Sequence, residues 1–415
     1  MTTHPPTGKP MNASQNVSAD AIVWADPARA LAFSAWLTGI CAAHGLDAAS
    51  VRLASADASF RRYFRIDAAG QPIGSASCII MDAPPDKEDC KPFVKVAALM
   101  ADAGLQAPRV LAWDQAAGFM LLSDLGRQTM MEVIAPPAAV DAIAQPTDQH
   151  LAMYLEAVDA LVRWQLASKP GVLPAYDDAL LGRELTLFPE WYVGRHRGFT
   201  LDTSQQHTLD EAFAQIRASN LQSLDGARVF VHRDFMPRNL IAPTLFASRA
   251  FGGALPLSFM DGANFPGGGP SENFMATKPG VPQLGVLDFQ DAVYGPITYD
   301  IASLMRDAFL SWEEDFVLEV TIRYWQKARK AGLPVGDDFG EFYRAVEWMG
   351  LQRHLKILGI FARLTLRDGK PKYLADTPRF IRYARATCMR YRKLGPMMVL
   401  LDAIEGNITR VGYTF

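Results

Sequence analysis

The residues best suited to chemistry lie in one short segment, Val229–Ile241. His232, Arg233 and Asp234 follow a run of β-branched and aromatic residues, and Asn239 comes shortly after the aspartate. An aspartate can accept a proton from an attacking hydroxyl, while an amide oxygen on the same tight loop can ligate Mg²⁺. The H-R-D-x-x-x-x-N spacing therefore indicates a loop for phosphoryl transfer, in preference to a buried aspartate that only caps a loop.

A second candidate segment, Leu284–Asp291, follows further along the chain. Its apolar residues predict a strand that ends at Asp288, where a rigid support would aim the carboxylate at bridging phosphate oxygens. An Asp-Phe pair alone is a weak signal. Because this pair follows the first segment along the chain, as it does in kinases, the two segments together are a strong signal. We therefore expect Asn239 and Asp288 to be metal ligands.

Two kinds of element must position these groups. Residues 26–125 contain several strand-like runs and one helical pattern at 90–103, which predicts a small α+β unit. Residues 126–415 are dominated by apolar residues at helical spacing and predict a larger, mainly helical lobe. The expected fold class is α+β with two lobes. We also expect a flexible tail over 1–25 and a mobile Gly/Pro-rich insertion over 243–283.

The composition of the 415 residues excludes several functional classes. The formal charge is −3, whereas a dedicated nucleic-acid binder shows a basic excess. The four cysteines form no C-x-x-C pair, which argues against a disulfide framework or a zinc site and fits a reducing compartment. No run approaches the ~18 apolar residues of a membrane span, and we find no signal peptide. We therefore expect a cytoplasmic monomer that binds neither nucleic acid nor membrane.

The two candidate segments and the run Gly295–Asp300 that follows them resemble the aminoglycoside phosphotransferase and choline kinase family of kinase-like enzymes. Within that family, four further runs resemble the anomeric kinases of cell-wall recycling, which phosphorylate N-acetylmuramate and N-acetylglucosamine at C1: Ser55–Arg65, Met81–Pro85, Phe188–Gly194 and Arg367–Pro371. The resemblance implies a bilobal protein-kinase-like fold, with an antiparallel sheet in the small lobe and mainly helices in the larger one. It also implies ATP-dependent phosphorylation of an amino sugar in peptidoglycan recycling.

The resemblance further implies roles for single residues. Asp234 would be the catalytic base, and Asn239 and Asp288 would bind Mg²⁺. Backbone groups of a hinge would bind the adenine of ATP, and a loop would cover its phosphates; the matching residues here are Ser123, Asp124 and Leu125 for the hinge, and Ser55, Asp57 and Ser59 for the loop. The loop lacks the glycines of protein kinases, but Ser and Asp tolerate the tight turns that it needs.

One departure from the kinase pattern concerns the ATP phosphates. Kinases carry a lysine on the third strand, and the matching run 78–82 contains none. Our hypothesis is that Arg61 or Arg62, on the neighbouring strand, contacts the phosphates instead. Other sources of positive charge nearby are Arg65, Lys91 and Lys95. A solvated strand face would explain the arginines equally well.

The acceptor pocket should offer carboxylates and a stacking ring for sugar hydroxyls, and a cation for the lactyl carboxylate of N-acetylmuramate. Glu184 and Trp191 would share one face of an expected helix over 178–195. The expected acceptor-binding residues are Glu184, Glu190, Trp191, Asp291 and Arg353, the last from a basic stretch at 351–373. An exposed basic helix face would also explain that stretch.

Two other kinds of function stay open. The same fold would serve an aminoglycoside, choline or homoserine kinase, although a polycationic aminoglycoside would require an acidic cleft. The missing lysine and glycine loop would suit a nucleotide-binding pseudokinase that acts as a binding module. The intact Asp234, Asn239 and Asp288 favour an enzyme.

Overall fold

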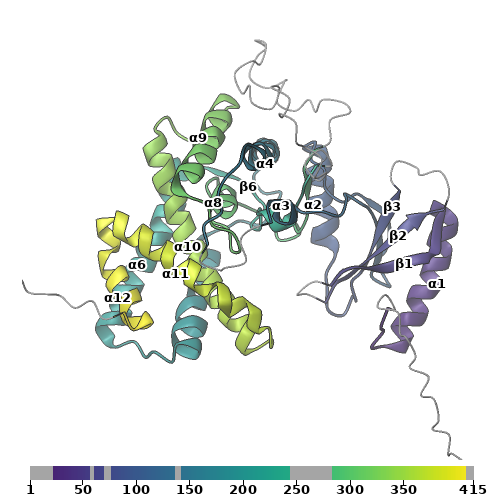
Figure 1. Cartoon of the computed structure of the whole chain (residues 1–415), viewed down its shortest axis with the longest axis horizontal. Helices are drawn as coiled ribbons and strands as arrows, with labels where there is room; N and C mark the ends of the chain where they lie inside the picture. The colour runs from purple at the N-terminus through teal and green to yellow at the C-terminus, as the bar shows by residue number, and fades with distance from the viewer. Residues whose placement is uncertain (1–21, 57–59, 70–75, 136–141, 244–282, 408–415) are drawn as a thin grey trace, which may run out of the picture. The chain divides into compact units, whose positions relative to one another are not determined.

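The computed structural model describes residues 22–56, 60–69, 76–135, 142–243 and 283–407. The chain divides into two compact units (Figure 1). The first comprises the chain up to Cys90 together with Val110–Asp124, and the second comprises Lys91–Arg109 and the chain from Leu125 onward. Apart from its end residues, the insertion predicted over 243–283 lies outside the described residues. Within the described ranges, none of the helices has the length and apolar character that a membrane crossing requires.

The first unit is built on a five-stranded antiparallel sheet with the strand order β1-β2-β3-β5-β4. The strands are β1 (Leu46–Ala56), β2 (Arg62–Ala68), β3 (Ser77–Asp82), β4 (Val110–Asp114) and β5 (Phe119–Ser123). Burial alternates along β2, where Phe64 and Ile66 enter an apolar core with Ile80 and Leu121. The sheet predicted for this part of the chain is therefore present.

Helix α1 (Pro27–His44) closes this core on one side. Asp26 caps its first turn by accepting a hydrogen bond from the Ala28 amide at 2.9 Å, and Gly45 ends it in the left-handed conformation that glycine adopts without strain. The ring of Phe33 lies 5.4 Å from Phe64 and 5.6 Å from Phe119, measured between centroids. The helix therefore packs on the sheet through aromatic contacts.

Helix α2 (Lys91–Asp102) groups with the second unit, although its sequence position placed it in the predicted first lobe. The reason is a set of contacts with residues far along the chain. The Phe93 ring packs with its centroid 4.8 Å from that of Phe289, and the Val286 amide donates to the Gln106 carbonyl at 2.7 Å. Such long-range contacts decide membership of a packed core, and local spacing does not reveal them.

The second unit is mainly helical, as predicted, and α10 (Phe339–Leu366) runs through its middle (Figure 1). Around it pack helices from distant parts of the chain. The remaining α-helices among the described residues of this unit are α3 (Met130–Ile134), α4 (Asp148–Leu166), α5 (Asp178–Leu187), α6 (Thr203–Gln222), α8 (Tyr299–Met305), α9 (Glu314–Lys330), α11 (Thr377–Arg390) and α12 (Gly395–Glu405). Short 3-10 turns lie at η2 (Ser223–Gly226), η5 (Pro371–Asp376) and η6 (Arg392–Leu394).

Helix α5 continues directly into a π-helix, η1 (Phe188–His196), and the joint rests on α10. Pro189 lacks a backbone N–H and cannot continue the regular hydrogen-bond ladder, which accounts for the widened turns. Gly359 of α10 lies against this joint: a Cβ there would come within 2.3 Å of the Leu187 carbonyl oxygen. The close approach therefore requires glycine.

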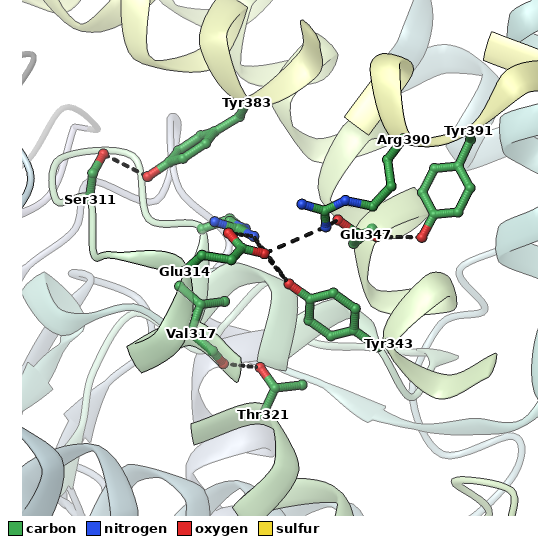
Figure 2. A network of polar contacts seen from close by, with 10 residues as sticks. Ser311, Glu314, Val317, Thr321, Tyr343, Glu347, Tyr383, Arg390 and Tyr391 are labelled. Carbon is green, nitrogen blue, oxygen red and sulfur yellow. Dashed lines mark hydrogen bonds and ion pairs between the residues drawn. The ribbon is translucent and has the colours of Figure 1, made fainter. Parts of the chain in front are cut away.

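A polar network also ties α9, α10 and α11 together (Figure 2). Glu314 of α9 accepts hydrogen bonds from Tyr343 of α10 at 2.5 Å and from Arg306 at 2.7 Å. Arg390 of α11 pairs with Glu347 of α10 and lies 3.5 Å from Glu314. The network stabilises the packing of these three helices against one another.

Candidate active site

Two short antiparallel ladders bring the predicted catalytic loop beside Asp288. The pairs are β6 (Arg228–Val231) with β9 (Val293–Pro296), and β7 (Leu240–Ile241) with β8 (Gly285–Val286). Residues 232–239 join β6 to β7, and residues 287–292 join β8 to β9. Because both ends of one loop are paired with both ends of the other, the two loops are held side by side. The Leu287 amide donates to the Asn239 carbonyl at 2.9 Å across them.

The structure brings together Asp234, Asn239 and Asp288. The Nδ2 amide of Asn239, at the end of the turn η3 (Pro237–Asn239), donates to the Asp234 carbonyl at 2.9 Å and to Asp288 Oδ2 at 3.2 Å. Gln290 Nε2 donates to Asp288 Oδ1 at 2.9 Å. No group of three His, Cys, Asp or Glu suited to a metal occurs in the described part of the chain. A metal at this point would therefore rely on one carboxylate, one amide oxygen and non-protein oxygens, a set typical of Mg²⁺.

The backbone is strained at both loops. Arg233 has a φ of 79° and Asp288 a φ of 63°, in the left-handed region that non-glycine residues rarely adopt. Such conformations cost free energy and persist only where the surroundings fix them. The strain here sits beside Asp234 and at the proposed metal ligand, the two places where the geometry of the reaction would be set.

His232 supports the loop as a neutral side chain. Its Nδ1 accepts a hydrogen bond from the Asp234 amide at 3.2 Å, so the ring proton is on Nε2, which donates to the Leu287 carbonyl at 2.9 Å. Burial lowers the pKa of His232 to about 4, although the nearby Asp234 and the Leu287 carbonyl favour the charged form. The ring therefore links the two loops and is not poised to exchange protons near neutral pH.

Asp300, the last residue of the Gly-Pro-x-x-x-Asp run, fixes the start of the predicted catalytic loop. It lies in α8, is fully buried, and accepts hydrogen bonds from the amides of His232 at 2.7 Å and Arg233 at 3.0 Å. Burial raises the pKa of Asp300 to about 7, while the two amides and the charge of Arg353 oppose that rise. The strained turn at Arg233 is thus held through its backbone.

Glu184, predicted to bind the sugar, lies in a buried network instead. The residue is 5% exposed, and both carboxylate oxygens accept hydrogen bonds from protein donors. These donors are Arg233 Nη2 at 2.5 Å, Lys356 Nζ at 2.7 Å, the Tyr176 hydroxyl at 2.5 Å and Gln352 Nε2 at 3.0 Å. Sequence reasoning missed this link to Arg233, and it counted Lys356 only as one residue of a basic stretch.

Glu190 and Trp191 do not share one regular helical face with Glu184, because the π-helix begins between them. Trp191 is only 8% exposed and packs in the core of the second unit, with the Arg195 guanidinium 3.9 Å above its ring. Glu190 is exposed and pairs with Arg195 at 3.2 Å. The Trp191 ring, on which a sugar was predicted to stack, is therefore covered by other protein groups in this structure.

The two remaining acceptor candidates have different surroundings. Asp291 is exposed in the turn after Asp288. Arg353 is only 3% exposed and lies over the Tyr299 ring at 5.3 Å. Its charge favours the ionised forms of the buried Asp300 and Asp307, where burial itself raises the pKa. The structure therefore places Arg353 within the interior of the second unit, whereas the basic stretch had suggested a pocket residue.

The structure separates the two arginines proposed for the ATP phosphates. Arg62 donates to Asp82 Oδ2 at 2.6 Å, and its guanidinium lies 4.0 Å over the Trp24 ring. The other Asp82 oxygen accepts from Arg29 of α1, also at 2.6 Å. Arg62 is thus engaged in holding α1 to the sheet. Arg61 has a different neighbour: its Nε lies 3.5 Å from a carboxylate oxygen of Glu88.

At the predicted hinge, the side chain of Asp124 contributes to the sheet. It accepts hydrogen bonds from Arg65 Nε at 2.6 Å and from Ser77 Oγ at 2.7 Å, and Ser123 ends β5. The division between the compact units falls between Asp124 and Leu125. Of the predicted phosphate loop, Asp57 and Ser59 lie outside the described residues, as does the side chain of Ser55.

Comparison with known proteins identifies the family. The model of the phosphotransferase enzyme family matches residues 50–244 and 271–339. N-acetylmuramate/N-acetylglucosamine kinase of Pseudomonas aeruginosa is 45% identical over 351 residues, which is 85% of this chain and 87% of the relative. The protein with the same name from Neisseria meningitidis serogroup B is 43% identical over 367 residues, 87% of this chain and 93% of the relative.

Among solved structures, choline kinase from Cryptosporidium parvum superposes with a TM-score of 0.52 at 11% identity, covering 89% of this chain and 99% of that one. At this identity the likeness concerns the fold alone, and it confirms the predicted protein-kinase-like α+β class. The chain belongs to the phosphotransferase enzyme family.

Proposed function

We propose that this chain is an ATP-dependent kinase that phosphorylates the anomeric (C1) hydroxyl of N-acetylmuramate or N-acetylglucosamine in peptidoglycan recycling. The observation that carries the proposal is the contact set of Asp234, Asn239 and Asp288. It occurs in a chain that is 45% and 43% identical to two kinases named for these two sugars. Both alignments extend over most of each protein, so the likeness is not limited to the catalytic loop.

Asp234 acts as the general base in this proposal. Its backbone is anchored at both the amide and the carbonyl, while no described residue donates a hydrogen bond to its carboxylate. The carboxylate accepts the proton of O1 as O1 forms its bond to the γ-phosphorus and the bond from that phosphorus to the ADP oxygen breaks. A hemiacetal hydroxyl is more acidic than an ordinary alcohol, so a carboxylate is a sufficient base.

Asn239 and Asp288 would hold Mg²⁺, and their donor atoms fit that ion. Nδ2 donates both of the side-chain hydrogen bonds of Asn239. The side-chain oxygen Oδ1 therefore remains as the ligand atom beside the Asp288 carboxylate. Two hard oxygen donors, completed by phosphate and water oxygens, suit Mg²⁺. When bound, the ion neutralises charge on the transferring phosphates. The protein's own contribution is to keep the two ligands at one fixed spacing.

For the nucleotide, we propose that backbone groups of Ser123, Asp124 and Leu125 bind the adenine. We propose that Arg61 contacts the phosphates. Arg62 binds the buried Asp82 at 2.6 Å and lies over the Trp24 ring, whereas the ion pair of Arg61 with Glu88 is longer, at 3.5 Å, and we choose Arg61 on that difference. For the acceptor sugar, the exposed Glu190 and Asp291 remain candidates.

The proposal is tested by ³¹P NMR of the products formed from ATP and a panel of acceptors. The panel is N-acetylmuramate, N-acetylglucosamine, kanamycin, choline and homoserine. We expect a new sugar phosphate resonance whose coupling to the anomeric proton assigns C1, with the two amino sugars only. Phosphorylation of another panel member instead would replace the proposed acceptor class. ATP consumption that no acceptor stimulates would contradict the kinase proposal.

We further propose that the protein works as a monomer in the cytoplasm. All four cysteines are free thiols in the structure, two of them buried, which suits a reducing compartment. Sedimentation at micromolar protein concentration would test the monomer.

A further inference from the structure

The carboxylate of Glu184 is saturated by protein donors. Oε1 accepts from Arg233 Nη2 at 2.5 Å and Lys356 Nζ at 2.7 Å, and Oε2 accepts from the Tyr176 hydroxyl at 2.5 Å and Gln352 Nε2 at 3.0 Å. An ionised carboxylate has about four lone-pair positions. All of them are therefore used within the protein, and none is left for a sugar hydroxyl.

The charges of this network stabilise one another inside the second unit. Burial alone would raise the pKa of Glu184, but Lys356 and Arg233 outweigh it and lower the pKa to about 2. Burial alone would lower the pKa of Lys356, and Tyr299, Glu184 and Asp234 raise it instead. Glu184 is therefore an anion held between two cations. The charge of Asp234 also raises the pKa of both cations.

Arg233 connects the network to the catalytic loop. It is the residue before Asp234, and its backbone has the strained φ of 79°. Asp300 holds its amide at 3.0 Å, and Glu184 holds its guanidinium at 2.5 Å. The strained residue is thus fixed through its backbone by α8 and through its side chain by Glu184 of α5, which α10 holds in turn. With only one of these anchors, the turn would be free to relax.

We propose that Glu184 is a positioning residue: by binding Arg233, together with Lys356 and Gln352 of α10, it fixes the left-handed turn that places Asp234. This inference deepens the proposed function and rests on it for its kinetic readout. Glu184 then acts on the rate of the chemical step and makes no contact with the sugar. The competing explanation, a carboxylate that binds sugar hydroxyls, makes a different kinetic prediction.

The test compares Glu184→Gln, Arg233→Met and the double variant. We expect kcat to fall about 100-fold in each single variant, the size of effect that a small misplacement of a catalytic group produces. KM for the sugar and for ATP should stay within about twofold, because binding groups are intact. The double variant should be no slower than the slower single one, because the two residues act through one contact. Arg233→Lys should recover part of the rate lost in Arg233→Met.

A second readout does not need activity. Hydrogen exchange of the peptide covering 230–241 should become faster in Glu184→Gln, because the turn is released. The matched control is Glu314→Gln, which removes a carboxylate from the other Glu–Arg–Tyr network of the same unit (Figure 2). It should lower thermal stability while leaving both kcat and exchange of that peptide unchanged.

The outcomes separate the inference from the function on which it rests. If the parent phosphorylates none of the amino sugars, the proposed function fails while the exchange experiment still decides the role of Glu184. Unchanged exchange in Glu184→Gln, a rise in sugar KM at constant kcat, or additive losses in the double variant would each overturn the positioning role. If Glu184→Gln does not fold, Arg233→Met gives the same test from the other side of the contact.

Discussion

The amide of Asn239 lies 3.2 Å from a carboxylate oxygen of Asp288, although the two residues belong to different loops of the sequence. The pairing of β7 with β8 brings them together, and the Asn239 amide simultaneously holds the carbonyl of Asp234. One side chain thus sets the spacing between the proposed base and the proposed metal ligand. Changes at these three positions should therefore affect chemistry and metal binding with little effect on stability.

Replacement of Asp234 by asparagine removes the base and keeps the shape of the side chain. Because the backbone contacts of the residue are unaffected, we expect normal folding and an unchanged melting temperature. Loss of general-base catalysis should lower kcat by about 10²–10⁴-fold. Steady-state kinetics with N-acetylmuramate measures the effect. Near-parental turnover in a folded variant would remove Asp234 from the mechanism.

Replacement of Asp288 by asparagine tests the metal site. The neutral amide can keep a contact with Gln290, so the loop should stay in place. Loss of the carboxylate should weaken Mg²⁺ binding about 10–100-fold, by analogy with the loss of groups that support metal ligands. Calorimetric titration of Mg²⁺ into the enzyme with ADP measures this without turnover. Equal Mg²⁺ affinity in parent and variant would show that Asp288 is not a ligand.

The two arginines of the first unit should respond differently to the same substitution. Arg62→Gln leaves one oxygen of the buried Asp82 without its ion-pair partner and removes a cation from the Trp24 ring, so stability should fall by about 1–3 kcal/mol. KM for ATP should not change. Arg61→Gln should raise that KM, because its charge is assigned to the phosphates. If neither variant changes the ATP KM, the phosphate role of both arginines is wrong.

The sequence pointed most directly to the residues whose signal is local, and their roles stay predictions. Asp234 and Asn239 share one loop, so their spacing carried the information directly. The sequence could not reveal that Arg233 meets Glu184, because that contact depends on how α5 packs beside the loop. The same holds for Trp191, whose ring is turned into the core where the π-helix interrupts the regular spacing. Residue types indicated the chemistry, while tertiary packing decided which side chains are accessible to a substrate.

The stability of the protein should also depend on the charge of Glu184. Its pKa is about 2 in the folded chain against an ordinary value of 4.5. A depressed pKa means that the stabilisation is complete above the unfolded value and is lost as the pH falls toward the folded value. The contribution is about 3 kcal/mol at neutral pH, and about 2 kcal/mol of it should disappear between pH 5 and pH 3.

Glu184→Gln isolates this contribution, because glutamine cannot titrate. Urea unfolding of parent and variant at pH 7, 5, 4 and 3 gives the difference in their free energies of unfolding, in which the titration of groups not coupled to Glu184 cancels. We expect the difference to be largest at pH 7 and 5 and to shrink at pH 4 and 3. A difference that stays constant from pH 5 to pH 3 would mean that the Arg233 and Lys356 contacts do not hold Glu184 ionised. The charge balance of the network described above would then be incorrect.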